Sequence, residues 1–140
     1  MELSDALAFA RVNTHSVLTT IRVNGRPQLS NVLHHVSDDG LIRISITADR
    51  AKYKNLVREP WAALHITQAD FWAYAVIEGD AELSPVSTVP GDATGQELAD
   101  LYRAMQGEHP DWDEYFAAMV KDERQVLRIR PTHAYGMLPQ

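Results

Sequence analysis

The sequence contains no cysteine. Disulfide bonds, thiolate nucleophiles and cysteine-ligated metals are therefore excluded, and a reducing cytoplasm suits the chain. Long apolar runs are missing too, so no segment is long enough to cross a bilayer as a helix. The first residues include Glu2 and Asp5 and lack the apolar core of a signal peptide. We expect a cytoplasmic protein without a membrane span.

Positive charge is also scarce, because 13 Lys and Arg residues stand against 19 Asp and Glu residues, a net charge of −6. A chain of this sign is not a general nucleic-acid binder. Its 140 residues are 45% hydrophobic and contain neither an internal repeat nor a low-complexity linker. We therefore expect one domain, residues 1–140, that is long enough to bury a core.

The common catalytic motifs are absent as well. The seven glycines form neither G-x-G-x-x-G nor a Walker loop, and no serine lies in G-x-S-x-G. The six histidines have no metal-ligand spacing, and His34 and His35, adjacent in a predicted strand, should point to opposite faces. The sequence thus names no nucleophile, general base or metal site. If the protein is an enzyme, a bound cofactor must supply the difficult step.

Apolar and β-branched residues predict six strands, at 17–23, 26–36, 41–47, 61–67, 72–83 and 125–130. Asn24-Gly25 is the strongest hairpin signal in the chain. Residues 131–140 are expected to be an irregular tail. Strands joined mostly by hairpins, with helices outside them, predict a small β-barrel of the α+β class.

Four helices are expected around these strands. One begins at Ser4, and another is the basic helix that follows residue 49. Thr94 and Glu97 fit a capping box for a third helix, and Asp111 with Glu114 begins the fourth.

The basic helix begins with Arg50-Ala51-Lys52-Tyr53-Lys54-Asn55, a local cationic cluster in an acidic protein. Asp49 is a suitable N-cap for this helix. A helix N-terminus presents unpaired N–H groups and a partial positive charge, so cations crowded there indicate a place to hold phosphate. A solvated basic face is the alternative interpretation.

Helical spacing separates the cations of this cluster. Arg50, Lys54 and Arg58 lie at i, i+4 and i+8 and form one exposed stripe. Lys52 instead lies at the edge of the inward face. An inward lysine is explained either by an anionic ligand in a cleft or by a stem that snorkels over apolar surface.

Polar side chains on the second predicted strand suit the edge of a planar heterocycle. Gln28 and Ser30 share one face and Asn31 lies on the other. We expect this strand to neighbour the strand that leads into the basic helix, so that amides and cations line one cleft. Trp72 and Tyr74 share a face of their strand, where they wall a flat ring, pack across a dimer interface or belong to the core.

Three segments, taken in order, resemble the split β-barrel flavoproteins related to pyridoxamine 5′-phosphate oxidase. They are Gly25-Arg26-Pro27-Gln28-Leu29-Ser30-Asn31-Val32, Arg50-Ala51-Lys52-x-x-Asn55-Leu56 and Trp72-x-Tyr74-x-x-x-Glu78-Gly79. The chain is most similar to the deazaflavin-dependent branch, whose cofactor is coenzyme F420, and the likeness continues to His133-x-Tyr135-Gly136. The resemblance implies a six-stranded split β-barrel with peripheral helices and a homodimer with cofactor sites at the subunit interface.

The resemblance also implies roles for individual residues and a reaction. The cofactor phosphate would be held by Arg50, Ala51, Lys52 and Asn55, with Lys54 nearer the acidic tail. The ring system would be bordered by Gln28, Ser30 and Asn31, with Trp72 and Tyr74 approaching from the other subunit. The implied activity is an oxidoreductase that passes hydride from the reduced deazaflavin to an electron-poor, conjugated small molecule.

Two other functions remain open from the sequence. An FMN-dependent oxidase of the pyridoxamine-phosphate type is the first, since FMN also ends in a phosphate; Arg128 and Arg130 are the nearest candidates for the second basic cluster that such an enzyme would need. A non-catalytic carrier of a deazaflavin, flavin or haem is the second. No residue pattern identifies a substrate.

Overall fold

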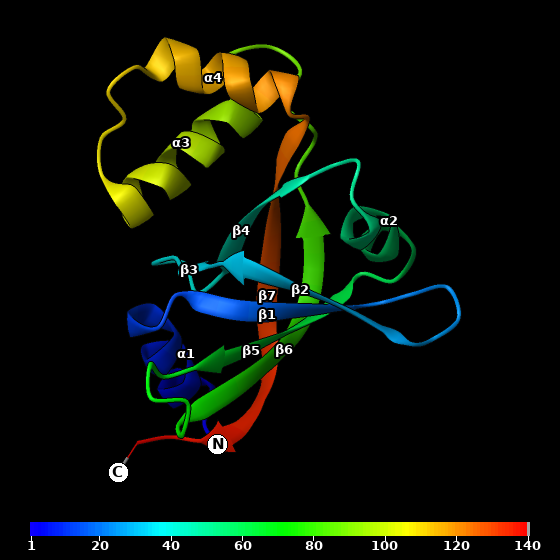
Figure 1. The fold of residues 1–140 in the computed structure, drawn as a ribbon, viewed down its shortest axis with the longest axis vertical. Helices are drawn as coiled ribbons and strands as arrows, with labels where there is room; N and C mark the ends of the chain where they lie inside the picture. Colours follow the sequence, from blue (N-terminus) through cyan, green and yellow to red (C-terminus); the bar gives the residue numbers. More distant parts are fainter. Residues whose placement is uncertain (140) are drawn as a thin grey trace.

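The computed structural model describes residues 1–139, which form one curled antiparallel sheet and four helices (Figure 1). The strands are β1 (His15–Ile21), β2 (Pro27–Leu33), β3 (His35–Val36), β4 (Ile42–Thr47), β5 (Trp61–Thr67), β6 (Tyr74–Leu83) and β7 (Arg124–Met137). The helices are α1 (Leu3–Val12), α2 (Ala51–Arg58), α3 (Ala93–Gln106) and α4 (Trp112–Lys121).

The strand order in the sheet is β2-β1-β5-β6-β7-β4-β3, and every hydrogen-bonded pair is antiparallel. The sheet curls into a half-barrel, so that β2, at one edge, contacts β4 near the other edge. This arrangement confirms the predicted α+β split barrel. The described residues contain seven strands where the sequence predicted six.

The additional strand arises at His34, where the predicted strand 26–36 is interrupted. The His34 N–H donates to the Thr14 carbonyl oxygen at 3.0 Å, and the ring nitrogens lie 2.8 Å from Ser16 Oγ and 3.0 Å from the Ala10 carbonyl oxygen. These contacts bury His34 completely and tie it to α1 and β1. After His34 the chain no longer pairs with β1, and His35 pairs with Arg43 of β4 at the opposite edge of the sheet.

β7 is much longer than predicted, so the expected irregular tail from residue 131 is wrong as far as Met137, and Gln140 lies outside the described residues. Pro131 cannot donate to a ladder, and the register shifts at this point, where β6 pairs Glu78 with His133 and Gly79 with Pro131. A Cβ on Gly79 would overlap the backbone carbonyl of Arg130. The bulge lets the strand continue past its proline.

Two clusters of buried side chains stabilise the fold. The larger one fills the inside of the half-barrel and packs against Ala6, Phe9 and Ala10 of α1. The smaller one consists of Leu98, Ala99, Tyr115 and Val126 and joins α3 and α4 to β7. The α3–α4 hairpin projects to one side of the barrel and is attached to β7 through this second cluster (Figure 1).

Asp92, and not the predicted capping box, begins α3. The Asp92 carboxylate accepts the Gly95 N–H at 2.8 Å, while the Thr94 hydroxyl donates to the Pro85 carbonyl oxygen at 2.8 Å. The prediction for α4 is confirmed, since Asp111 accepts the Glu114 N–H at 3.2 Å. None of the four helices formed by residues 1–139 is long and apolar enough to span a membrane.

Candidate functional site

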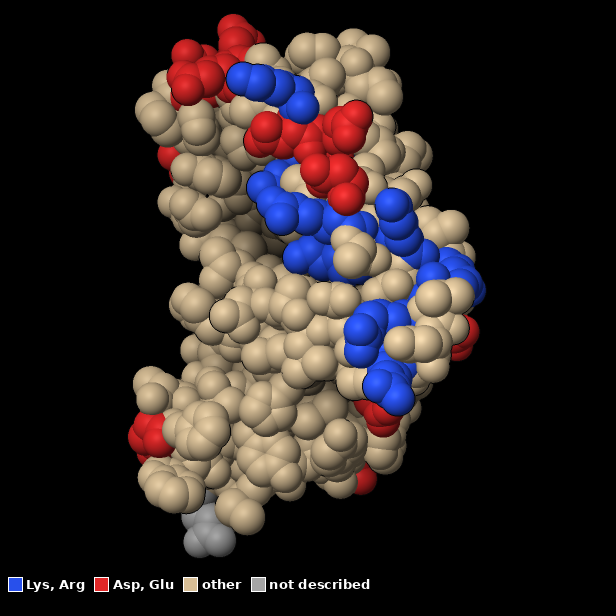
Figure 2. All heavy atoms as spheres, turned by 45° about the vertical axis from the view of Figure 1, so that its right-hand side comes forward, with Lys and Arg blue, Asp and Glu red and all other residues tan. Residues whose placement is uncertain are grey.

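A cleft of about 640 Å³ separates the α3–α4 hairpin from the barrel. It lies where β2 and β4 face each other across the split, at the beginning of α2. Its lining consists of Asn31, Val32, Leu33, Ser45, Ile46, Thr47, Arg50, Lys52, Leu98, Leu101, Tyr102, Met105, Gln106, Tyr115, Met119 and Arg124. In Figure 2, Lys and Arg side chains gather beside the hollow between the hairpin and the barrel.

Three cations, Arg50, Lys52 and Arg124, share this lining, which contains no carboxylate. Burial lowers the pKa of the Lys52 ammonium below its usual 10.5, and repulsion from Arg50 and Arg124 adds to the decrease. Within residues 1–139, neither Lys52 nor Arg124 forms an ion pair, and Arg50 has only a 3.9 Å contact with Asp49. Cations that converge without a counter-charge are the electrostatic signature of an anion site.

Arg124 is the cation of the cleft that the sequence did not reveal. It begins β7 opposite Thr47, and its Nη1 donates to Ser45 Oγ at 3.3 Å. Its Nε is buried and has no hydrogen-bond partner in the described chain, which is costly for a guanidinium unless a ligand completes the site. The predicted last strand began one residue later, so pairing this strand with 41–47 was the signal that could have found Arg124.

The N-terminus of α2 opens at the same cleft. Arg50, rather than the predicted Asp49, is the N-cap residue, and no side chain caps the helix. No acidic side chain lies in the first turn. The first N–H groups, those of Ala51 and Lys52, have no intrahelical acceptor and are available to an anion.

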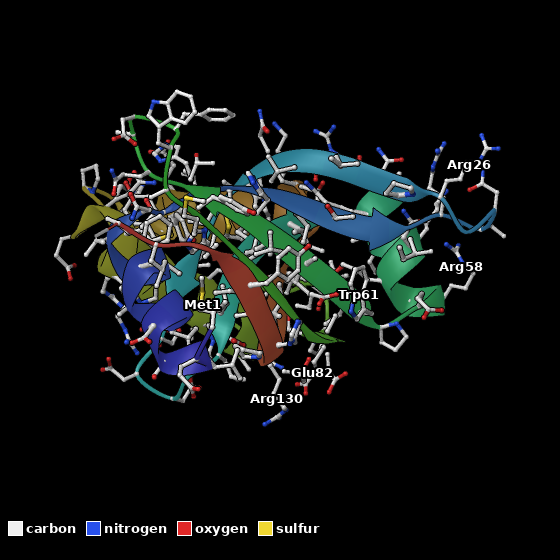
Figure 3. All side chains as sticks on the ribbon, turned by 90° about the horizontal axis from the view of Figure 1, so that it is seen from below. Met1, Arg26, Arg58, Trp61, Glu82 and Arg130 are labelled. Atoms are coloured by element: carbon white, nitrogen blue, oxygen red, sulfur yellow. The ribbon has the colours of Figure 1, made fainter. Side chains whose placement is uncertain are left out.

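Asn55 is not among the residues that line the cleft. It is 6% exposed, donates from Nδ2 to Thr20 Oγ1 at 3.1 Å and accepts from Arg58 Nη2 at 3.1 Å. Asn55 therefore connects α2 to β1, and in this way it positions the cations of α2 indirectly. Arg50, Lys54 and Arg58 are exposed, as the spacing predicted. Figure 3 shows Arg58 and Arg26 at the same end of the molecule, where the Arg58 guanidinium also donates to the Ile21 carbonyl oxygen.

The polar residues of β2 are divided between two places. Asn31 lines the cleft, whereas Gln28 and Ser30 are half-buried opposite Thr20 and Leu18 of β1 and are not part of the lining. The strand expected at residues 26–36 neighbours β4 in the sheet only through its last two residues, which form β3, whereas β2 lies at the opposite edge. Curling of the sheet nevertheless brings Asn31 to the cleft that contains the cations.

Trp72 and Tyr74, which were expected to border the cofactor ring, do not line the cleft of their own chain. Trp72 lies in the turn before β6 and is 80% exposed. Tyr74 is half-buried, with its ring centroid 5.4 Å from that of His65. Neither belongs to the core, so core packing does not explain this pair.

Arg128, one candidate for a second basic cluster, is engaged elsewhere. Its Nε donates to Glu97 Oε2 at 2.8 Å, and its Nη1 donates to Glu82. Arg43 Nε donates to the same Glu97 oxygen at 3.0 Å, so Glu97 links α3 to both β4 and β7. The two guanidinium groups lower the pKa of the Glu97 carboxyl, with Arg128 the larger cause. Arg130 points into solvent away from the barrel (Figure 3).

The described residues contain no evident metal-binding site. Among residues 1–139, no three or more His, Asp or Glu side chains gather in a metal-binding arrangement.

Comparisons with known proteins agree on the fold. The sequence profile described as "Pyridoxamine 5'-phosphate oxidase" matches residues 5–138. A structure titled F420 reductase is 23% identical, with a TM-score of 0.69, covering 91% of this chain and 94% of its own. A conserved hypothetical protein from Mycobacterium tuberculosis is 21% identical, with a TM-score of 0.74 and coverages of 100% and 90%.

A third similar structure is a putative pyridoxamine 5′-phosphate oxidase from Listeria innocua. It is 16% identical, with a TM-score of 0.66 and coverage of 96% of both chains. These identities establish a shared fold and not a shared ligand. The profile match over nearly the whole length shows that the chain belongs to the pyridoxamine 5′-phosphate oxidase family.

Proposed function

We propose that the cleft binds the phosphate of coenzyme F420 and that the protein is an F420-dependent reductase of an electron-poor, conjugated small molecule. The observation that carries this proposal is the convergence of Arg50, Lys52 and Arg124 in a lining without a carboxylate. The unpaired Nε of Arg124 adds a buried donor that needs an acceptor.

The residues present fit a phosphate-bearing planar cofactor. Arg50, Lys52 and Arg124 supply the charge, and the backbone N–H groups of Ala51 and Lys52 supply directional donors. A volume of about 640 Å³ lies within the range of small-molecule and cofactor sites. Asn31 is the residue of β2 that would border the ring, since Gln28 and Ser30 lie outside the lining. Bound in its reduced form, F420 supplies a two-electron hydride donor.

F420 is favoured over FMN by the cations outside the cleft. Lys54 and Arg58 lie on the exposed face of α2, with Arg22 and Arg26 in the neighbouring β1–β2 turn. A ligand with a phosphate and a long acidic tail would use both groups of cations, whereas the phosphate of FMN needs only the first. Arg128 and Arg130 do not extend the charge of the cleft, which weakens the case for a phosphorylated substrate.

A homodimer would complete the site. Large apolar side chains are exposed where the segment before β6 meets the end of β7, including Phe71 at 72%, Trp72 at 80% and Met137 at 65%, and Met137 pairs with Tyr74. An exposed apolar surface of this kind marks an interaction surface. We propose that a second copy covers it, so that Trp72 and Tyr74 approach the ring bound by the partner subunit.

Turnover distinguishes the reductase from a carrier. Purified protein is mixed with reduced F420 and a soluble quinone, and oxidation of the cofactor is followed by its absorbance. We expect enzyme-dependent oxidation in wild type that Lys52→Ala reduces strongly and Arg11→Ala, at an exposed position on α1, leaves unchanged. Tight binding without turnover of any enone or quinone would instead identify a carrier.

A further inference from the structure

The cleft has two chemically different walls. The barrel side carries all three cations of the lining, whereas the hairpin side is formed by Leu98, Leu101, Tyr102 and Met105 of α3 with Tyr115 and Met119 of α4. No charged side chain comes from this second wall, and Gln106 is its one amide. A cofactor whose phosphate lies at the first wall and whose ring lies along β2 at Asn31 would leave the second wall without an occupant.

The apolar wall is exposed because of the way in which the hairpin is built. Its own core is small, and Tyr102 and Met119 are only partly buried where they pack against that core. Met105 is also partly buried on the same wall. These side chains thus keep apolar surface facing the cleft, where burying it against a ligand would be favourable.

The wall is also held firmly in place. Glu97 connects α3 to Arg43 of β4 and Arg128 of β7. Between the helices, the Tyr115 hydroxyl donates to the Leu98 carbonyl oxygen at 2.9 Å, and burial raises the pKa of Tyr115 to about 12. The Tyr115 hydroxyl is therefore used in a hydrogen bond within the hairpin, and its ring provides an apolar packing surface.

We propose that the hairpin wall is the acceptor subsite and takes the uncharged, planar, apolar part of the molecule that is reduced. This inference rests on the proposed function and adds to it the class of acceptor and the residues that select it. Met105, Met119 and Tyr102 determine which molecules fit. Because methionine is flexible and polarisable, a wall with two methionines accepts rings of different outline, such as quinones and extended enones.

The test uses menadione, an uncharged naphthoquinone, as the probe and measures its dissociation constant on the full chain with and without oxidised F420. The double variant Met105→Gln/Met119→Gln keeps side-chain length and helix propensity and adds polarity. Val120→Thr is the control, because Val120 is half-buried on the same helix and is not part of the lining. Thermal melting followed by circular dichroism verifies that each variant is folded.

We expect the double variant to weaken menadione binding about tenfold, the effect of adding polarity to an apolar pocket, while the dissociation constant of F420 changes less than about twofold. Val120→Thr should leave both values unchanged. An unaltered menadione affinity in the double variant, or an equal loss in the control, overturns the subsite. A wild type that binds menadione on this wall but not F420 retains the subsite and refutes the proposed cofactor.

Discussion

At the scale of single residues, three cations, Arg50, Lys52 and Arg124, line the candidate site and repel one another. Lys52 has a lowered pKa because it is partly buried beside Arg50 and Arg124. Mutual repulsion of this kind disfavours the unliganded state, and a bound dianion removes it. We therefore propose that the three cations, which repel one another without a ligand, make phosphate binding favourable.

Replacement of Lys52 tests this arrangement directly. We expect Lys52→Ala to weaken binding of F420 by about 1.5–3 kcal/mol, the usual contribution of a charge-assisted hydrogen bond. Isothermal titration at constant ionic strength measures the change, and Arg11→Ala controls for net charge. Equal affinities for wild type and Lys52→Ala would remove this lysine from the site.

A second residue-scale prediction concerns His34. Burial lowers its pKa below the ordinary 6.5, with nearby His15 and His35 acting in the same direction. Between the lowered value and 6.5 the unfolded chain binds more protons, so the free energy of unfolding falls as the pH falls through this window. Urea unfolding at pH 7.5 and pH 5.5 measures the decrease.

Two variants assign the acid sensitivity to its source. His34→Gln should have a smaller pH dependence in this window, because it lacks the buried imidazole. His133→Gln, at an exposed position and not among the groups that shift the pKa of His34, should retain the wild-type dependence. If both variants lose stability with acid as wild type does, His34 is not the group responsible.

At the scale of elements, α3 and β7 are joined by charge. Glu97 accepts from Arg43 and Arg128 at a side-chain exposure of 20%, whereas Glu108 pairs with Arg103 at an exposure of 74%. We expect Glu97→Gln to lower the free energy of unfolding by about 1–3 kcal/mol, since two partly buried guanidinium groups lose their counter-charge.

Glu108→Gln is the matched control for this change. An exposed pair contributes about 0–1 kcal/mol, so urea unfolding should separate the two variants clearly. A loss of similar size in both would mean that Glu97 does not anchor the hairpin.

Elements also show how far the sequence could predict the fold. Alternation along β1 and β4 reflects a buried face in each strand and was readable locally, as was the cationic start of α2. The break at His34 was not readable, because its cause is a set of hydrogen bonds to Ala10, Thr14 and Ser16 of preceding segments.

The same reasoning applies to the site. Lys52 was predicted to face inward from helical spacing alone, and it does line the cleft. Arg124 was missed because only the pairing of β7 with β4 brings it to that place. Asn55 fitted the pattern of the cluster, but a buried bond to Thr20 determines its position. Local periodicity therefore predicts faces, and tertiary pairing selects which residues on those faces meet.

At the scale of the whole molecule, we propose that one chain is an incomplete site and that a second copy covers the exposed Trp72. We expect sedimentation to show a dimer, and expect Trp72→Ser to weaken dimerisation by about 2–4 kcal/mol, as for a large aromatic anchor. Thr88→Ala, on an exposed loop, is the control. A monomeric wild type that still binds F420 tightly would contradict the proposed contribution of the partner subunit.

We propose that the cleft recognises a phosphate with an acidic tail. Fluorescence titration of the purified protein with F420, run beside FMN at several salt concentrations and repeated with Arg124→Met, tests this recognition. We expect preference for F420, an affinity that decreases with salt, and a marked loss of affinity in the variant. Preference for FMN would transfer the protein to the oxidase alternative, and failure to bind either ligand would contradict the assignment of the cleft.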